Sequence, residues 1–158
     1  HQPLYVSRSN KRLWRRHEYR LSGNEDFIGV MQACREQRDG CWISDKIIAL
    51  YSAAQQQGFG LSVECWHDKQ LVGGLYGLAI GGAFFGESMF SRQSGASKIA
   101  LIALHQALRK AGYRLFDVQY RNAHLEQFRI EEISRESYLE QLESALQITP
   151  KMIDIGVR

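Results

Sequence analysis

The sequence predicts an α/β (α+β) fold, in which helices flank a mixed but mostly antiparallel sheet. The first observation is a pair of apolar runs, 71–80 and 83–90, joined only by Gly81-Gly82. A two-glycine link between such runs is typical of a β-hairpin, because the favoured turns need positive φ angles. The second observation is a long apolar-periodic segment, 97–111, followed by a short apolar run, 113–119. Strand, strand, helix and strand therefore follow one another at the centre of the chain.

The strand–helix–strand crossover at 83–119 predicts how these elements are arranged. Such crossovers are right-handed and bring the second strand back parallel to the first. A basic, Ser/Gly-rich link at 92–96 precedes the helix, and Gly112 ends it. The helix N-terminus should then lie beside the C-terminal end of the strand at 83–90. Free backbone N–H groups there favour an anion or a developing oxyanion.

The first 36 residues should supply two helices and one short strand. Residues 1–6 are expected to form an edge strand or a tail, Ser9 to cap a helix over 10–17, and 19–21 to form the strand. Asn24 is expected to cap the second helix, whose apolar residues recur at i, i+3, i+4 and i+7. Core packing explains that stripe.

The next stretch leads into the hairpin. A turn at 38–44 should precede a helix that Ser44 caps and Gly58 ends. Apolar and polar residues alternate over 60–66, which predicts a half-buried strand. The turn at 67–70 then joins this strand to the hairpin, so that three strands make an antiparallel meander.

After the crossover we expect a helical turn at 123–129, a short strand at 130–133 and a last helix. Ser134 should cap that helix and Pro150 end it, and the tail 151–158 is unassigned. Four residues should form its buried face: Tyr138, Leu139, Leu142 and Leu146.

The composition fits one globular domain, 1–158, because 44% of its 158 residues are hydrophobic and 23% are charged. The apolar runs are too short to span a bilayer and no secretory signal is visible, so we expect a cytoplasmic protein without membrane association. Three cysteines lack metal-ligand spacing, and buried reduced thiols account for them: Cys34, Cys41 and Cys65.

The net charge of +3 says little, but the charges are unevenly distributed. Basic residues crowd the N-terminal stretch around Trp14 and His17. They are Arg8, Lys11, Arg12, Arg15, Arg16 and Arg20. A solvated helix face and a phosphate-contacting patch both fit this pattern.

Polar groups occur in the central unit where a plain core would lack them. Glu87 stands inside an apolar strand, and burying a carboxylate is costly unless it is paired or used. A β-bulge at Gly86 would re-aim the side chains after it and place Phe84, Glu87 and Met89 on one face.

The last strand of the crossover ends in a second polar group. Asp117 and Gln119 share a face, and Asn122 follows just beyond. If the two neighbouring strands splay, Glu87 and this acid–amide couple would line one cleft.

Together, several stretches resemble the leucyl/phenylalanyl-tRNA–protein transferase family, whose fold is related to that of acetyltransferases (GNAT-like). The resemblance runs from about residue 5 to residue 142, and the combination of motifs is specific. The stretches are SRSNKR (7–12), CWIS (41–44), LVGGLYG (71–77), FFGESMFSR (84–92), ASK (96–98) and DVQ with Asn122 (117–122).

The resemblance implies an acyltransferase that moves Leu, Phe or Met from aminoacyl-tRNA to the N-terminal Arg or Lys of an acceptor protein. This addition is the N-degron tag that directs the acceptor to degradation. The ester is already activated, so the reaction needs no metal, cofactor or covalent nucleophile. The site must instead bring two substrates together and stabilise the tetrahedral oxyanion.

The resemblance also implies roles for the polar residues. Asp117 and Gln119 match an acid–amide pair near the attacking amine, and Asn122 matches an amide that orders water there. Glu87 matches a carboxylate that holds the aminoacyl ammonium. An amide is no strong base, so Gln119 would orient or relay a proton, and assistance by the tRNA ribose is an equally physical route.

Further matches concern binding. Six positions match a pocket for the donor's apolar side chain: Leu75, Phe84, Met89, Leu101, Leu108 and Phe116. Two match aromatic residues that hold the terminal adenosine, although core packing also explains them: Trp42 and Tyr51. Four match a basic cluster that faces the tRNA acceptor stem: Lys11, Arg12, Arg15 and Arg16.

The family pattern is not followed everywhere. The family has an additional N-terminal segment, and it usually has Ser-Leu-Gly where this chain has Gln127, Phe128 and Arg129, whose bulk should crowd the turn and reshape the acceptor site. A diverged or non-catalytic paralogue that binds tRNA or protein N-termini is therefore an alternative. A GNAT-type acyl-CoA N-acyltransferase is another, since 92–97 nearly matches a pyrophosphate-binding loop at a helix start.

Overall fold

A five-stranded sheet organises the computed structural model, which describes residues 4–16, 18–37, 40–119 and 123–156. The strand order follows the chain, with antiparallel pairs from β1 to β4 and a parallel pair between β4 and β5. The strands are β1 (Arg20–Gly23), β2 (Gly60–His67), β3 (Gln70–Ile80), β4 (Ala83–Ser91) and β5 (Leu115–Asp117). This mixed, mostly antiparallel sheet confirms the predicted fold class.

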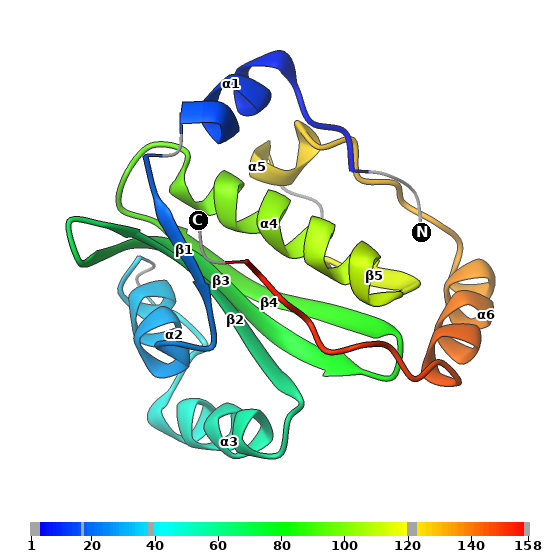
Figure 1. Cartoon of the computed structure of the whole chain (residues 1–158). Helices are drawn as coiled ribbons and strands as arrows, with labels where there is room; N and C mark the ends of the chain where they lie inside the picture. The colour runs from blue at the N-terminus through cyan, green and yellow to red at the C-terminus, as the bar shows by residue number, and fades with distance from the viewer. Residues whose placement is uncertain (1–3, 17, 38–39, 120–122, 157–158) are drawn as a thin grey trace.

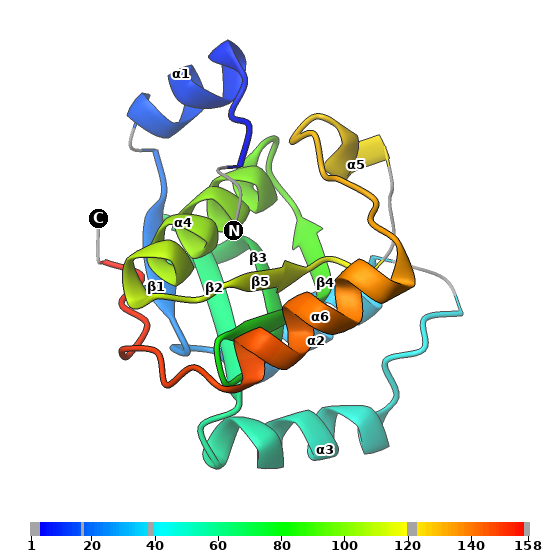
Figure 2. The same ribbon diagram turned by 90° about the vertical axis from the view of Figure 1, so that its right-hand side faces the viewer.

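Helices cover both faces of the sheet (Figures 1 and 2). The first core cluster joins α4 to one face, and the second joins α2 and α3 to the other. The helices are α1 (Arg8–Arg16), α2 (Phe27–Glu36), α3 (Asp45–Gln56), α4 (Ala96–Ala111), α5 (Ala123–Glu126) and α6 (Arg135–Leu146). No helix among the described residues is both long and apolar enough to cross a membrane.

The central crossover is built as predicted. Gly81, at φ 54°, makes the hairpin turn between β3 and β4, and Gly112, at φ 93°, ends α4. α4 is buried on nearly every side, because the sheet lies beneath it and side chains from α1, α5 and the tail pack over it. β5 returns parallel to β4 but is shorter than the predicted 113–119.

The predicted β-bulge is present in β4. Tyr76 faces Ser88 across the hairpin, whereas the next residue, Gly77, faces Gly86. Glu87 is therefore the extra residue on β4, and the ladder between β3 and β4 is interrupted at this point.

Two predicted helix caps are wrong, although the helices exist. Ser7 rather than Ser9 precedes α1, and its hydroxyl accepts a backbone hydrogen bond from the first turn. Asp26 rather than Asn24 caps α2. The Asn24 side chain instead accepts a hydrogen bond from the backbone N–H of Ser62 in β2, at 2.8 Å. The predicted caps of α3 and α6 are confirmed.

β2 is buried on both faces, not half-buried as its alternation predicts. The N-terminus of α2 covers the polar face, where Glu64 is fully buried. The hydroxyls of Ser22 and Ser62 both donate to its carboxylate. Burial raises the pKa of Glu64, and these hydrogen bonds oppose that shift. The network ties β1 to β2, which alternation alone could not indicate.

The C-terminal region departs most from expectation. Residues 130–133 form no strand, and together with the edge strand β5 they line a groove. In α6, Leu139 and Leu146 are 45% and 44% exposed, and only part of the predicted face is buried. The helix ends at Leu146, before Pro150.

Replacing Gly77 by alanine should destabilise the fold strongly. A Cβ at this position would lie 2.1 Å from the carbonyl oxygen of Phe85 and 2.6 Å from the ring of Phe84. We expect a loss of about 2–3 kcal/mol in the free energy of unfolding, because the bulged hairpin must open to admit the methyl group. Urea denaturation measures this loss. Gly86→Ala is the control, since its nearest contacts are an ordinary 3.4 Å; equal losses in both variants would contradict the prediction.

Candidate active site

β4 and β5 pair over only three positions, from Ala83↔Leu115 to Phe85↔Asp117. Beyond them the bulge at Glu87 disrupts β4 and β5 ends, so the two strands no longer share a ladder. A cavity of about 350 Å³ lies at this point, and we call it the strand cavity. Its lining residues are Trp42, Leu75, Tyr76, Phe84, Gly86, Glu87, Ser88, Met89, Leu101, Phe116, Val118, Gln119 and Leu125.

Most of the predicted catalytic and substrate-binding residues meet in the strand cavity. Glu87 from β4 and Gln119 from the end of β5 both line it, whereas Asp117, the acid of the predicted couple, does not. Six further predicted residues also line it: Trp42, Leu75, Phe84, Met89, Leu101 and Phe116. Leu108 does not, because it is fully buried in the core beneath α4. Asn122 lies outside the described residues.

One wall of the strand cavity is apolar. Phe84 and Phe116 meet edge to face, with ring centroids 5.4 Å apart, and pack with Leu75 and Leu101 into the core on the α4 side. Such a surface accepts an uncharged side chain and disfavours a charged one through the cost of desolvation.

The other wall is polar, because the carboxylate of Glu87 reaches Tyr51 of α3. Burial, the charge of Glu87 and a hydrogen bond between the two side chains raise the pKa of Tyr51 to about 12. Phe84 and Met89 pack instead on the α4 side. The predicted common face for Phe84, Glu87 and Met89 is therefore wrong, although all three line the cavity. Trp42, 48% exposed, lies at the cavity as well.

Asp117 is held in place by two hydrogen bonds. The backbone N–H of Gln119 donates to one carboxylate oxygen at 2.7 Å, and the Tyr138 hydroxyl donates to the other at 2.8 Å. Gln119 has a φ angle of 61°, which is uncommon for a residue with a side chain. Tyr138 was missed as a site residue, since its place in the α6 stripe indicates only packing.

Asp117 faces a second hollow, of about 600 Å³, which we call the edge groove because β5 is the edge strand. Acidic residues contribute to its lining: Asp117, Glu131 and Glu132. The strand cavity and the edge groove share only residues at the end of β5: Phe116, Val118 and Gln119. Gln119 therefore lies where the two hollows meet.

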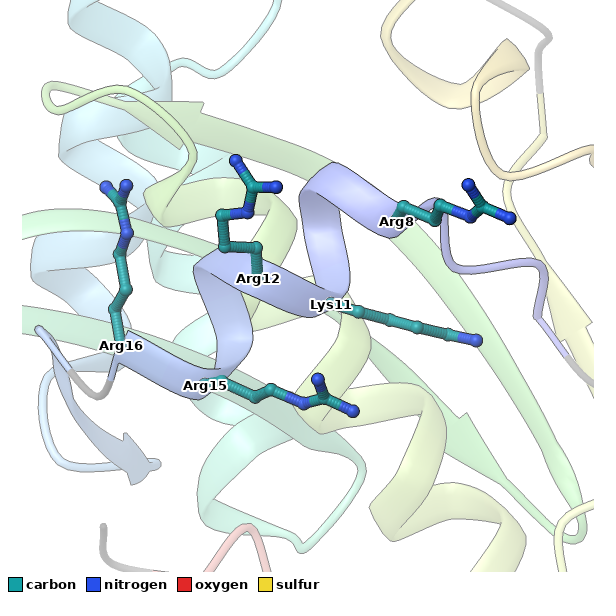
Figure 3. A pocket seen from close by; sticks show the side chains of 5 residues that line it. All are labelled: Arg8, Lys11, Arg12, Arg15 and Arg16. Carbon is teal, nitrogen blue, oxygen red and sulfur yellow. The ribbon is translucent and has the colours of Figure 1, made fainter.

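The basic residues of α1 form one surface, shown in Figure 3. Their spacing of i, i+3, i+4, i+7 and i+8 places them on one side of the helix, while Leu13 and Trp14 pack inward. We call this surface the basic face, and it consists of Arg8, Lys11, Arg12, Arg15 and Arg16. All five are exposed. Like charges so close together repel one another, so the basic face favours a polyanion as its partner.

α1 also covers the start of α4, where an anion site was expected. A Cβ on Gly95 would lie 2.3 Å from Leu13 of α1. The backbone N–H of Ser97 donates to the Ser91 hydroxyl, and Arg92 pairs with Glu36 at 2.8 Å. Protein groups therefore occupy the loop that resembles a pyrophosphate-binding motif.

The turn at 127–129 is not crowded by its large residues. Phe128 is buried in the core, and Gln127 accepts a hydrogen bond from the Asn10 side chain at 3.3 Å. Arg129 adopts φ 52° and places its guanidinium 4.0 Å from the ring centroid of Tyr5. These side chains join the turn to the N-terminal segment.

Known proteins resemble this chain along nearly its whole length. A family model described as leucyl/phenylalanyl-tRNA protein transferase matches residues 1–143. A protein of that name from Hyphomonas neptunium is 50% identical over 152 residues, which cover 92% of this chain and 59% of the relative. One from Dinoroseobacter shibae is 49% identical over 143 residues, which cover 90% of this chain and 64% of that relative. The chain thus spans about three fifths of the length of these two relatives.

The fold has a parallel among solved structures. An aminoglycoside acetyltransferase from an uncultured soil metagenomic sample aligns with a TM-score of 0.54 and 12% identity, covering 87% of this chain and 93% of the other. At that identity the likeness concerns the fold alone, and it confirms the acetyltransferase-related architecture. The family is shown by the sequence relatives: the chain belongs to the leucyl/phenylalanyl-tRNA–protein transferase family.

Proposed function

We propose that this chain carries the catalytic site of an aminoacyl-tRNA–protein transferase. It would transfer Leu, Phe or Met from tRNA to the N-terminal Arg or Lys of an acceptor protein in the cytoplasm. The observation that carries this proposal is the position of Gln119, at the junction of the strand cavity and the edge groove. A two-substrate reaction needs two approaches that meet at one point, and this arrangement offers them.

The donor would occupy the strand cavity. Its apolar side chain would lie against Leu75, Phe84 and Phe116, and Glu87 would hold its ammonium. Trp42, half exposed beside the same cavity, offers a ring on which the terminal base can stack. The apolar wall favours Leu, Phe and Met over charged amino acids, because a charged side chain would lose its hydration there.

The acceptor would approach through the edge groove. Its N-terminal Arg or Lys carries positive charge on both the amine and the side chain. The groove is lined by three carboxylates, Asp117, Glu131 and Glu132, and by one cation, Arg135, so acidic groups predominate. The hydrogen bonds to Asp117 fix both of its oxygens beside Gln119. The groove is therefore electrostatically suited to a cationic N-terminus.

In the proposed reaction the neutral α-amine attacks the ester carbonyl carbon and forms a tetrahedral oxyanion. The bond between that carbon and the ribose oxygen then breaks, and a peptide bond remains. The amine loses a proton and the ribose oxygen gains one. Gln119 would orient the amine and relay the proton that the amine loses, and Asp117 would accept that proton through the relay. Most of the acceleration would come from placing an activated ester beside the amine.

Acyl-CoA transfer is less well supported. The related fold favours it, but Leu13, Ser91 and Glu36 engage the loop that would bind the pyrophosphate. A non-catalytic tRNA- or N-terminus-binding paralogue is the other alternative, and the transfer assay below separates it from an enzyme.

Mixing the protein with leucyl-tRNA and an Arg-ended peptide should add one leucine to the peptide, which mass spectrometry detects. Gln119→Ala should slow this transfer by roughly 100-fold, as expected for loss of a group that positions a proton transfer. Gln56→Ala, an exposed change on α3, is the matched control. Undiminished transfer by Gln119→Ala would remove Gln119 from the mechanism. Absence of transfer in the wild-type protein, with acetyl-CoA binding by titration, would favour the acyl-CoA alternative.

The basic face should bind tRNA through phosphates. Changing Lys11 and Arg12 together to glutamine should weaken tRNA binding and lower the slope of log K against log salt by about 1.5, because each lost phosphate contact contributes about 0.7–0.9. Titrations at several salt concentrations measure this slope. Lys151→Gln is the control, since Lys151 lies at the opposite end of α4. An unchanged slope in the double variant would assign the basic face no part in tRNA binding.

A further inference from the structure

One residue that lines the strand cavity carries a buried polar group that lacks a partner within the described part of the protein. Tyr76, in β3, is fully buried, and its hydroxyl is the only buried side-chain oxygen or nitrogen without a hydrogen bond in the described part of the chain. Leaving such a group unpaired costs roughly 1–3 kcal/mol. A phenylalanine of the same shape would avoid that cost. The presence of the hydroxyl therefore points to a hydrogen-bond partner that the free protein does not contain, such as a bound substrate.

Tyr76 belongs to the polar wall of the strand cavity. Its ring packs edge to face against Tyr51, with centroids 5.7 Å apart, and against Phe27 at 5.9 Å. Tyr51 in turn contacts Glu87, which lines the cavity together with Tyr76. Burial raises the pKa of Tyr76, so its phenol stays protonated and can donate a hydrogen bond. The rings that surround Tyr76 hold the hydroxyl in one place without satisfying it.

The proposed donor has polar groups that Glu87 and Trp42 do not account for. Its side chain would lie on the apolar wall, its ammonium on Glu87 and its base on Trp42. The ribose and the ester join those parts, and their oxygens are the polar atoms that remain. In the proposed complex the base and the amino acid both lie along the strand cavity. The ribose and ester oxygens that link them would therefore lie next to the wall of the cavity.

We propose that the Tyr76 hydroxyl positions the donor by hydrogen-bonding a ribose or ester oxygen at the end of the aminoacyl-tRNA. This inference rests on the proposed function. Donor binding would supply the partner that the free protein lacks, so that the hydroxyl destabilises the empty protein and stabilises the complex. Tyr76 would help to orient the donor ester for attack, and it would not exchange a proton with either substrate.

Tyr76→Phe tests the proposal with two measurements on one variant. The probe is a hydrolysis-resistant analogue, an adenosine whose 3′ amine carries leucine through an amide bond. The variant should unfold at a temperature roughly 2–6 °C higher when free, because the unpaired hydroxyl is gone. It should bind the probe roughly three- to tenfold more weakly, because one hydrogen bond to a neutral group is lost. Tyr113→Phe removes a phenol buried in the core outside the strand cavity and should leave the affinity unchanged.

A 2′-deoxy form of the probe identifies the bonded atom. If the Tyr76 hydroxyl contacts the 2′-hydroxyl, the loss in affinity disappears with this form; if it contacts the amide carbonyl that replaces the ester, the loss persists, and both results support the proposal. Unchanged affinity of Tyr76→Phe for both forms would overturn it and would leave the proposed transferase function intact. Failure of the wild-type protein to bind either form would instead overturn the proposed donor site itself, and this inference with it.

Discussion

The constraint on which the site depends is the early end of pairing between β4 and β5. Asp117 accepts the N–H of Gln119, and Gln119 takes a left-handed backbone conformation, so β5 cannot continue as a strand. On the neighbouring strand, the bulge at Glu87 interrupts the ladder between β3 and β4 just beyond the same point. Both breaks occur next to the last pair, Phe85↔Asp117. A continuous ladder would have closed the sheet at the place where the strand cavity lies.

The two layers of helices give the opening its chemistry. α4 contributes apolar side chains from one face of the sheet, and α3 contributes Tyr51 beside the Glu87 carboxylate from the other. Because the strands no longer share a ladder there, residues associated with both layers line a single cavity. Sharing a fold with acetyltransferases does not by itself determine what this cavity binds, because function depends on the residues placed in the site. Here α1 covers the start of α4 through Leu13, and exposed cations stand on its outer side.

Local sequence signals predicted the centre of the chain well, because its geometry is fixed by nearby residues. The glycine turn, the bulge next to Gly86 and the crossover to β5 all follow from patterns within a few positions. Errors arose where distant residues compete for the same groups. Asn24 bonds to Ser62 instead of capping α2, and Leu108 packs into the core although it lies two turns from Leu101 on α4. The unpaired hydroxyl of Tyr76 had no signal in the sequence, since a core tyrosine and a ligand-binding tyrosine look alike there.

The turn at 127–129 shows how nucleic-acid binding could be linked to the site in the proposed reaction. Arg129 has a left-handed backbone conformation, where its side chain costs about 1 kcal/mol, and its contact with the Tyr5 ring offsets a cost of that size. Gln127 holds Asn10 of α1 in the same region. Leu125, two residues before Gln127, lines the strand cavity. The helix that carries the basic face therefore contacts both α4 and the segment at 125–127, which includes a residue that lines the strand cavity. Phosphate contacts made on α1 would therefore fix where the acylated end of the tRNA lies, and binding energy from the remote part of the substrate would orient the ester for attack.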